Sequence, residues 1–222
     1  MVELQRQPAL APAAAPPNES AACLRWLQPQ LALPTMSPTP MAPASGDILA
    51  SKRLAIRHTM FDADWQRVRS ERISPARYAR ALGSAPQAPA TALGRVNAWV
   101  NHNIAYVEDR ALFGKADYWA GAVRTLKLRQ GDCEDIALTK MQLLAAAGIP
   151  RDDMVLTIAR DLVRGADHAI LMVKQDGRYV MLDNATDTVL DASAANDYRP
   201  VLSFGQHQAW LHGYQPAALT VQ

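Results

Sequence analysis

The sequence lacks the features that would point to a nucleic acid or to a membrane. Its 222 residues carry 23 lysines and arginines against 21 aspartates and glutamates, a formal net charge of +2. That charge is too small to indicate a nucleic acid or an anionic membrane surface as a partner. No run of about 18 apolar residues occurs, so no transmembrane segment is expected. Hydrophobic residues still make up 49% of the chain, which predicts a globular protein with a buried core.

Cysteine is scarce, since Cys23 and Cys133 are the only two. We expect no disulfide between them, because Cys23 lies in a proline-rich stretch and Cys133 in a segment with an ordered pattern. A single cysteine near the histidines also argues against a structural zinc site. His207 and His212 are five residues apart, which is not the i, i+4 spacing of a helical zinc pair.

Proline marks the expected division of the chain. Nine of the 15 prolines lie in residues 1–46, where alanine is also abundant and no period appears, so this stretch is predicted to be a disordered leader. It does not read as a secretory signal peptide, which needs a basic start and an unbroken apolar run. We expect a basic, partly helical segment and linker at 47–90, the main domain at 91–214 and a tail at 215–222.

The main domain changes its hydrophobic period along its length. Helical spacing runs from residue 93 to 104, a short helix is predicted over 117–126, and a third helix follows Cys133 and stops at Gly148 and Pro150. Strands are predicted at 154–159, 168–173, 178–182 and 201–204, with Asp176-Gly177 as a two-residue hairpin turn. Helices followed by an antiparallel sheet indicate an α+β fold.

Cys133 falls at the first position of the third predicted helix. Asp132 is a suitable N-cap and Asp135 follows three residues later, as in a capping box. The free N–H groups and the dipole at a helix start favour a thiolate and can stabilise an oxyanion. The neighbouring carboxylates of Asp132, Glu134 and Asp135 oppose a thiolate by repulsion. An imidazolium or a divalent cation must offset them, and clustered carboxylates suit calcium.

The predicted hairpin brings a histidine and an aspartate to one face of the sheet. If Gln175 pairs with Arg178 across the turn, Ile170 lies opposite Asp183, and His168 shares the face of Ile170. His168 and Asp183 are then diagonal neighbours, with Cα atoms roughly 7–8 Å apart. Each residue alone has an ordinary structural explanation. Together with a cysteine at a helix start, they form the nucleophile, base and orienting group of a cysteine hydrolase.

Four motifs carry a resemblance to a known family. Asp117-Tyr118-Trp119-Ala120, Gly131-Asp132-Cys133-Glu134-Asp135, Asp167-His168-Ala169 and Leu182-Asp183-Asn184 resemble the bacterial transglutaminase-like cysteine peptidases of the LapG type. The resemblance covers about residues 95–212, and Gly131–Asp135 is its most specific part. It implies a papain-like fold, in which the helix that bears the nucleophile packs on an antiparallel sheet. His168 is followed by Ala-Ile-Leu, which departs from the Met-Val-Leu expected in the family.

The resemblance also implies a function. It implies hydrolysis of a peptide bond in a protein substrate through Cys133, His168 and Asp183, without an organic cofactor. It implies calcium bound by Asp132 and Glu134, and Trp119 near the site, in an oxyanion-side or a packing role. The substrate of the type is a large biofilm adhesin, a membrane-bound regulator is a candidate partner, and the periplasm is the expected location. Without a clear signal peptide, the cytoplasm stays open as the alternative.

Two rival functions remain compatible with the same residues. The triad would also support a transglutaminase reaction, in which the acyl group passes to an amine instead of water. Alternatively, the chain is a non-catalytic calcium-binding scaffold that keeps the fold. Product mass separates the first rival from hydrolysis, and a cysteine that does not react with a probe would support the second.

Overall fold

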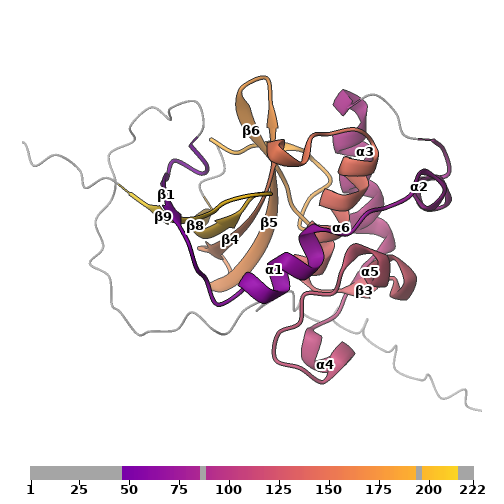
Figure 1. The fold of residues 1–222 in the computed structure, drawn as a ribbon, viewed down its shortest axis with the longest axis horizontal. Helices are drawn as coiled ribbons and strands as arrows, with labels where there is room; N and C mark the ends of the chain where they lie inside the picture. Colours follow the sequence, from indigo (N-terminus) through magenta and orange to yellow (C-terminus); the bar gives the residue numbers. More distant parts are fainter. Residues whose placement is uncertain (1–46, 86–88, 194–196, 215–222) are drawn as a thin grey trace, which may run out of the picture.

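The structure, a computed structural model, describes residues 47–85, 89–193 and 197–214 (Figure 1). The predicted leader at 1–46 and tail at 215–222 lie outside the described residues, so these predictions stay untested. The helices are α1 (Asp62–Arg69), α2 (Pro75–Leu82), α3 (Pro89–Asn103), α4 (Asp109–Phe113), α5 (Ala122–Leu128) and α6 (Cys133–Ala146), with a 3-10 turn η1 (Arg151–Asp153). The strands are β1 (Lys52–Ile56), β2 (Ala105–Tyr106), β3 (Gln130–Gly131), β4 (Met154–Asp161), β5 (Ala166–Gln175), β6 (Arg178–Leu182), β7 (Leu190–Asp191), β8 (Tyr198–Phe204) and β9 (Ala209–Gly213).

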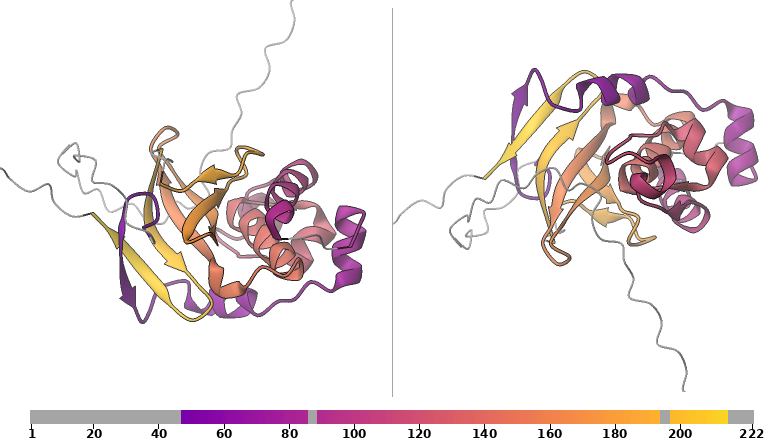
Figure 2. Two further views of the ribbon diagram at one scale, coloured as in Figure 1. Left: turned by 90° about the horizontal axis from the view of Figure 1, so that it is seen from above. Right: turned by 90° about the horizontal axis from the view of Figure 1, so that it is seen from below.

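The main sheet has seven strands in the order β1-β9-β8-β4-β5-β6-β7, and every neighbouring pair is antiparallel. The helices gather on one side of it, as the two further views show (Figure 2). A small parallel pair, β2 with β3, lies outside the main sheet. This arrangement of helices against an antiparallel sheet confirms the predicted α+β class.

The hairpin of β5 and β6 has the predicted register. Gln175 pairs with Arg178 and Leu171 with Leu182. Asp176 and Gly177 both have positive φ, 49° and 81°, which is the backbone of a type I′ turn. That turn fits the right-handed twist of the strands, so a local sequence signal sets the register of the whole hairpin.

Two hydrophobic clusters cover the two faces of the sheet. The larger cluster joins the helices to one face and includes Trp119, Leu138, Ile158 and Leu171, whereas the smaller one covers the other face around Ile170. Ile170, on β5, is fully buried, and so is most of β4 and β5. Burial on both faces explains why these strands read as continuous apolar runs rather than as alternating ones.

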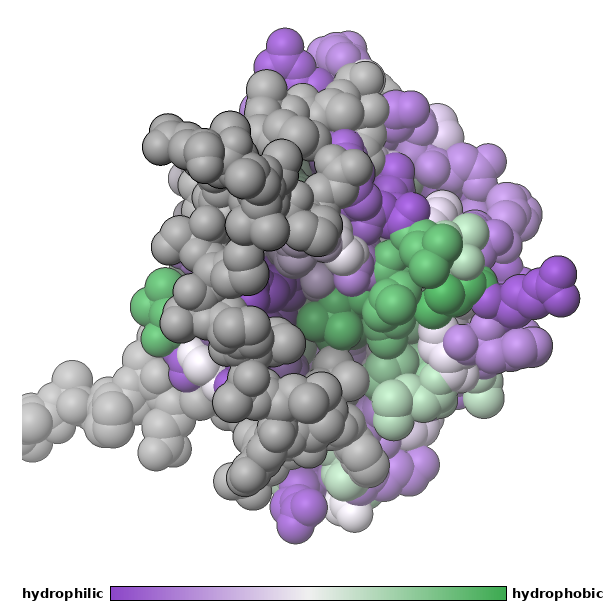
Figure 3. Space-filling model, turned by 90° about the vertical axis from the view of Figure 1, so that its left-hand side faces the viewer, coloured by the Kyte–Doolittle hydropathy of each residue, from purple (hydrophilic) through white to green (hydrophobic). Residues whose placement is uncertain are grey.

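The segment before the predicted domain joins this same sheet. β1 pairs with β9 along its full length, from Lys52 opposite Gly213 to Ile56 opposite Ala209. Leu54 and Leu211 are exposed cross-strand neighbours on these two strands. The space-filling view from the side where β1 and β9 lie shows apolar residues gathered among polar ones (Figure 3).

One local prediction is wrong, and another is confirmed only in part. The helix predicted over 117–126 begins only at Ala122, because Gly121 takes the N-cap position and the residues before it are held by other elements. The backbone oxygen of Trp119 accepts a hydrogen bond from Arg67, and the Ala120 N–H donates to Asp135 Oδ1 over 2.6 Å. Asp132 is the N-cap of α6, but its side chain makes no capping hydrogen bond. Asp135 holds Ala120 with Oδ1, and the backbone N–H groups of Asp132 and Asp135 each lower the pKa of the other residue's carboxyl group, as in a loosely closed capping box.

Candidate active site

Cys133 begins α6, where the sequence predicted it, and is almost fully buried, with 1% of its surface exposed. The Ala169 N–H on β5 donates a hydrogen bond to its Sγ over 3.3 Å. Glu134 Oε2 also lies 3.3 Å from Sγ. The sulfur therefore meets β5 at the residue that follows His168.

Cys133 is disulfide-bonded in this structure. The other cysteine of the chain, Cys23, lies outside the described residues. Only the thiolate is nucleophilic, so any reaction at this sulfur requires the reduced form.

His168 and Asp183 are in direct contact, as the hairpin register predicted. His168 Nε2 donates to Asp183 Oδ1 over 2.8 Å. The Ala185 N–H donates to the same oxygen over 3.1 Å, and the Tyr198 hydroxyl donates to Oδ2 over 2.6 Å. Because Nε2 is engaged by the carboxylate, Nδ1 is the ring nitrogen left for another group.

The hydrogen bonds determine the charge of Asp183. Burial by itself would raise the pKa of this carboxyl group, but the hydrogen bond and charge of His168, the Tyr198 hydroxyl and the Ala185 N–H together hold its pKa well below the usual range. Asp183 is therefore a carboxylate at neutral pH. Such a group can fix the tautomer of the histidine and stabilise its protonated form.

Tyr198 is a site residue that sequence reasoning missed, and a bulge explains why. In a regular strand it would share the face of Leu202, which belongs to the larger cluster. The pairing of β8 with β4 shifts between Ile158 and Ala159, where Ala159 pairs with Pro200. Proline cannot donate a ladder hydrogen bond, and an extra residue reverses the faces beyond it. Tyr198 thus packs against the smaller cluster, on the face of His168.

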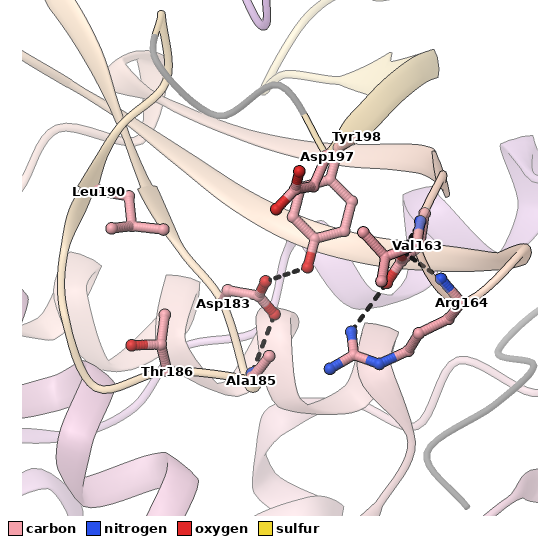
Figure 4. Close-up of a pocket in the computed structure, with 9 residues that line it drawn as sticks. Val163, Arg164, Asp183, Ala185, Thr186, Leu190, Asp197 and Tyr198 are labelled. Atoms are coloured by element: carbon pink, nitrogen blue, oxygen red, sulfur yellow. Dashed lines mark hydrogen bonds and ion pairs between the residues drawn. The ribbon is translucent and has the colours of Figure 1, made fainter.

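A cavity of about 260 Å³ adjoins the His168–Asp183 pair. Asp183 and Tyr198 line one part of it (Figure 4). The turn after β4 lines another part with Val163 and Arg164, and Arg164 pairs with Asp161 over 2.8 Å. The wall therefore combines charged groups with apolar ones, and it reaches the carboxylate that holds the histidine.

Acidic residues surround Cys133 more densely than the sequence suggested. Asp109, at the start of α4, joins Asp132 and Glu134, and one oxygen from each lies within 4.8 Å of the others. We call these three residues the acidic cluster. All three are buried. Sequence reasoning missed Asp109, because only the tertiary fold brings α4 to the start of α6.

The acidic cluster holds its protons more tightly than ordinary carboxyl groups do. Burial, with the charges of Asp117 and Glu108, raises the pKa of Asp109 to about 6, against the hydrogen bond from the Tyr118 N–H. Burial and mutual repulsion raise the pKa values of Asp132 and Glu134 well above their usual range. Asp109 Oδ1, Asp132 Oδ1 and Glu134 Oε1 have no hydrogen-bond partner among the described residues.

Two further buried residues complete the surroundings. Trp119 is fully buried, stacks on Phe61 with ring centroids 5.2 Å apart and meets Phe204 edge-on. This position supports its packing role, and the oxyanion-side role stays a prediction. Lys140, two turns after Cys133 on α6, is also fully buried. Burial lowers the pKa of its ammonium group to about 7, against the charges of Asp183 and Asp187.

Comparison with known proteins places this geometry in a family. Residues 66–212, more than half of the chain, match the model for bacterial transglutaminase-like cysteine proteinases. No curated protein matches the chain significantly. No helix among the described residues is long and apolar enough to cross a membrane.

Solved structures of Legionella pneumophila LapG are similar in sequence and fold. One is 27% identical, covers 67% of this chain and 86% of that chain, and superposes with a TM-score of 0.53. The EGTA-treated form is 27% identical, covers 67% of this chain and 84% of that chain, and has a TM-score of 0.53. The calcium-bound form is 26% identical, covers 71% of this chain and 91% of that chain, and has a TM-score of 0.54. The chain belongs to the bacterial transglutaminase-like cysteine proteinases and is a cysteine protease of LapG type.

Proposed function

We propose that the protein hydrolyses a peptide bond in a protein substrate, with Cys133 as nucleophile, His168 as general base and Asp183 as the group that orients the histidine. The contact between His168 and Asp183 over 2.8 Å, next to the Ala169 N–H that touches Cys133 Sγ, carries this proposal. Asp183 engages Nε2, so Nδ1 is the nitrogen that takes the proton of the reduced thiol.

The reaction follows the usual sequence of acyl transfer. His168 accepts the proton of Cys133, and the sulfur attacks the amide carbon of the substrate. The N–H groups at the start of α6 stabilise the oxyanion, since they point along the helix axis and have no intrahelical partner. The imidazolium gives its proton to the leaving amine, and the C–N bond breaks. Water, activated by His168, then attacks the thioester and releases the acid and the free thiol.

The acidic cluster fits a calcium ion. Three buried carboxylates offer oxygen ligands, the type that calcium prefers, and each has an oxygen without a hydrogen-bond partner among the described residues. Asp132 and Glu134 were predicted as ligands, and Asp109 is added by the fold. A bound divalent cation would supply positive charge beside Cys133 and offset the carboxylates that oppose a thiolate. The calcium-bound form of LapG supports this reading.

The family likeness guides the remaining proposals. We propose a large cell-surface adhesin as the substrate, a membrane-bound protein as a candidate regulator, and the periplasm as the location. These follow from the likeness to LapG and from no contact within this chain.

The test is cleavage of a mixed peptide library by the reduced full-length protein with calcium present, read by mass spectrometry. New termini that are absent with Cys133→Ala would support hydrolysis. Products that carry an added amine would instead identify a transglutaminase reaction. A library that Cys133→Ala processes as well as the wild type does would reject Cys133 as the nucleophile, and no processing by either protein would favour the scaffold.

A further inference from the structure

Tyr198 contacts both members of the His168–Asp183 pair with one side chain. Its hydroxyl donates to Asp183 Oδ2 over 2.6 Å. Its ring stacks on the imidazole of His168, with centroids 5.6 Å apart and planes 24° apart. The close-up shows the hydroxyl pointing at the carboxylate (Figure 4). No other aromatic ring among the described residues is found against His168.

We propose that Tyr198 is a positioning residue that fixes the orientation of the His168 ring and of the Asp183 carboxylate for proton transfer from Cys133. The inference rests on the proposed function, and it adds a fourth residue to the three that the sequence indicated. Tyr198 acts through His168 and Asp183 and takes up no proton itself.

The hydrogen bond controls the rotation of the carboxylate. Oδ1 of Asp183 accepts from His168 and from the Ala185 N–H, whereas Oδ2 accepts from Tyr198. With donors on both oxygens, the plane of the carboxylate is fixed, and Oδ1 stays directed at Nε2. Loss of the tyrosine hydroxyl would leave Oδ2 facing the cavity and free the carboxylate to rotate.

The stacked ring controls the imidazole. A phenol ring nearly parallel to the imidazole restricts rotation of that ring about its χ2 angle. The same face attracts the imidazolium that forms when the thiol proton is taken up, through a cation–π interaction. The two contacts therefore act on the same proton transfer, one through each neighbour.

Tyr198 is itself held in place and kept neutral. It begins β8 and pairs with Asp161 of β4. Burial, with the charge of Asp183 and its hydrogen bond, raises the pKa of the phenol well above its usual range, against the charge of Arg164. The titratable groups that face it are Asp183 after β6, His168 on β5, Asp161 on β4 and Arg164 in the turn after β4. The hydroxyl consequently remains a donor throughout the pH range in which the enzyme would work.

The test separates the two contacts with two variants. Tyr198→Phe keeps the stacked ring and removes the hydroxyl, whereas Tyr198→Leu removes both. The readout is the rate at which iodoacetamide alkylates Cys133 in the reduced full-length protein, measured from pH 5 to 9 and assigned to the Cys133 peptide by mass spectrometry. Tyr179→Phe serves as the control, because Tyr179 contacts Arg53 on β1 and lies away from this pair.

We expect Tyr198→Phe to lower the alkylation rate near pH 6 by about 10-fold, the value of one hydrogen bond to a charged group. Tyr198→Leu should exceed this effect, and Tyr179→Phe should match the wild type. Profiles of Tyr198→Phe that coincide with the wild type would overturn the positioning role, whatever Tyr198→Leu does to folding. Failure of the proposed function looks different, because His168→Ala would then leave the wild-type profile unchanged as well.

Discussion

The acidic cluster next to Cys133 and the His168–Asp183 pair both bury carboxyl groups, yet the pKa values of these groups move in opposite directions. Asp109, Asp132 and Glu134 have raised pKa values, whereas the pKa of Asp183 is lowered. Burial alone raises all four pKa values. Asp183 differs because donors reach both of its oxygens, whereas each member of the acidic cluster keeps an oxygen without a partner among the described residues. Hydrogen-bond donors therefore balance the charge of the Asp183 carboxylate, whereas the acidic cluster keeps oxygens that are suited to bind a cation.

The largest effect is expected from removing the negative charge of Asp183. Asp183→Asn should lower the rate of peptide cleavage by about 10³- to 10⁴-fold, because the amide stabilises neither the tautomer nor the charged form of His168. The rate is measured on a peptide recovered from the library assay. Asp187→Asn is the matched control, since Asp187 is exposed and bonded to His102. A loss of less than about 10-fold with Asp183→Asn would show that the pair does not serve catalysis.

Calcium should have the next largest effect, which is on the melting temperature and acts through the acidic cluster. A ligand at 100 times its dissociation constant stabilises a protein by about 2.7 kcal/mol, which for a domain of this size raises the melting temperature by roughly 5–10 °C. Differential scanning fluorimetry with calcium or EGTA measures this shift. Glu134→Gln and Asp109→Asn should each reduce it strongly, whereas Asp152→Asn, on exposed η1, should keep it. A shift that survives both changes would place the calcium elsewhere.

A pH titration should distinguish the two regions within one protein. The folded acidic cluster binds protons more tightly than the unfolded chain, so protonation stabilises the fold. For Asp109 this stability is complete below about pH 4 and is lost as the pH rises through about 6. In EGTA the acidic cluster should therefore raise the free energy of unfolding, measured in urea, as the pH falls from 8 to 5, against the opposite contributions of Lys140 and His212, whose pKa values are lowered to about 7 and about 4. Asp183 contributes no change there, because its lowered pKa matters only below about pH 4.

The variant Asp109→Asn tests whether the acidic cluster causes this pH dependence of stability. The amide removes one titrating group, so the rise in stability from pH 8 to 5 should become smaller in EGTA. Saturating calcium should flatten the rise in the wild type, since a bound cation competes with protons. A pH dependence of Asp109→Asn that matches the wild type in EGTA would contradict the reading of the acidic cluster.

The smallest effect is expected where the scaffold supports the pair. Asn101 on α3 donates to the backbone oxygens of Asp183 and Thr186 over 3.1 and 2.9 Å. Asn101→Ala should lower the stability by about 1 kcal/mol and the alkylation rate of Cys133 by less than Tyr198→Phe does. Thermal melting and the alkylation assay report the two quantities. An alkylation loss larger than that of Tyr198→Phe would mean that the loop after β6 governs the site more than the side-chain contacts of Asp183 do.

Short-range patterns predicted the parts of the site that lie close together in the chain. The Asp176-Gly177 turn fixed the register of the hairpin, and side chains alternate between the two faces of each strand, so the sequence placed His168 beside Asp183. The helix start at Asp132 placed Cys133. Tyr198 and Asp109 could not be predicted from the sequence, for two different reasons. A bulge between Pro200 and Leu202 reversed the face on which Tyr198 lies, and Asp109 meets Asp132 only through the packing of α4 beside the start of α6.

The fold could be predicted from the sequence to a similar extent. The class and the four central strands were predicted from the hydrophobic period, with ends that differ by a few residues. The pairing of β1 with β9 joins residues about 160 positions apart, and no local signal specifies such a partner. Tertiary contacts also decided the region around Trp119, where the backbone is held by Arg67 and Asp135 rather than coiled into a helix.

The most direct test of the central claim is the alkylation of Cys133 with and without its histidine. In reduced full-length protein with calcium, iodoacetamide should modify Cys133 at pH 6 at least about tenfold faster in the wild type than in His168→Ala, because proton uptake by the imidazole favours the reactive thiolate. Mass spectrometry of the Cys133 peptide gives both rates, and the melting temperature checks that the variant is folded. Equal rates in two folded proteins would contradict the assignment of Cys133 and His168 as nucleophile and base.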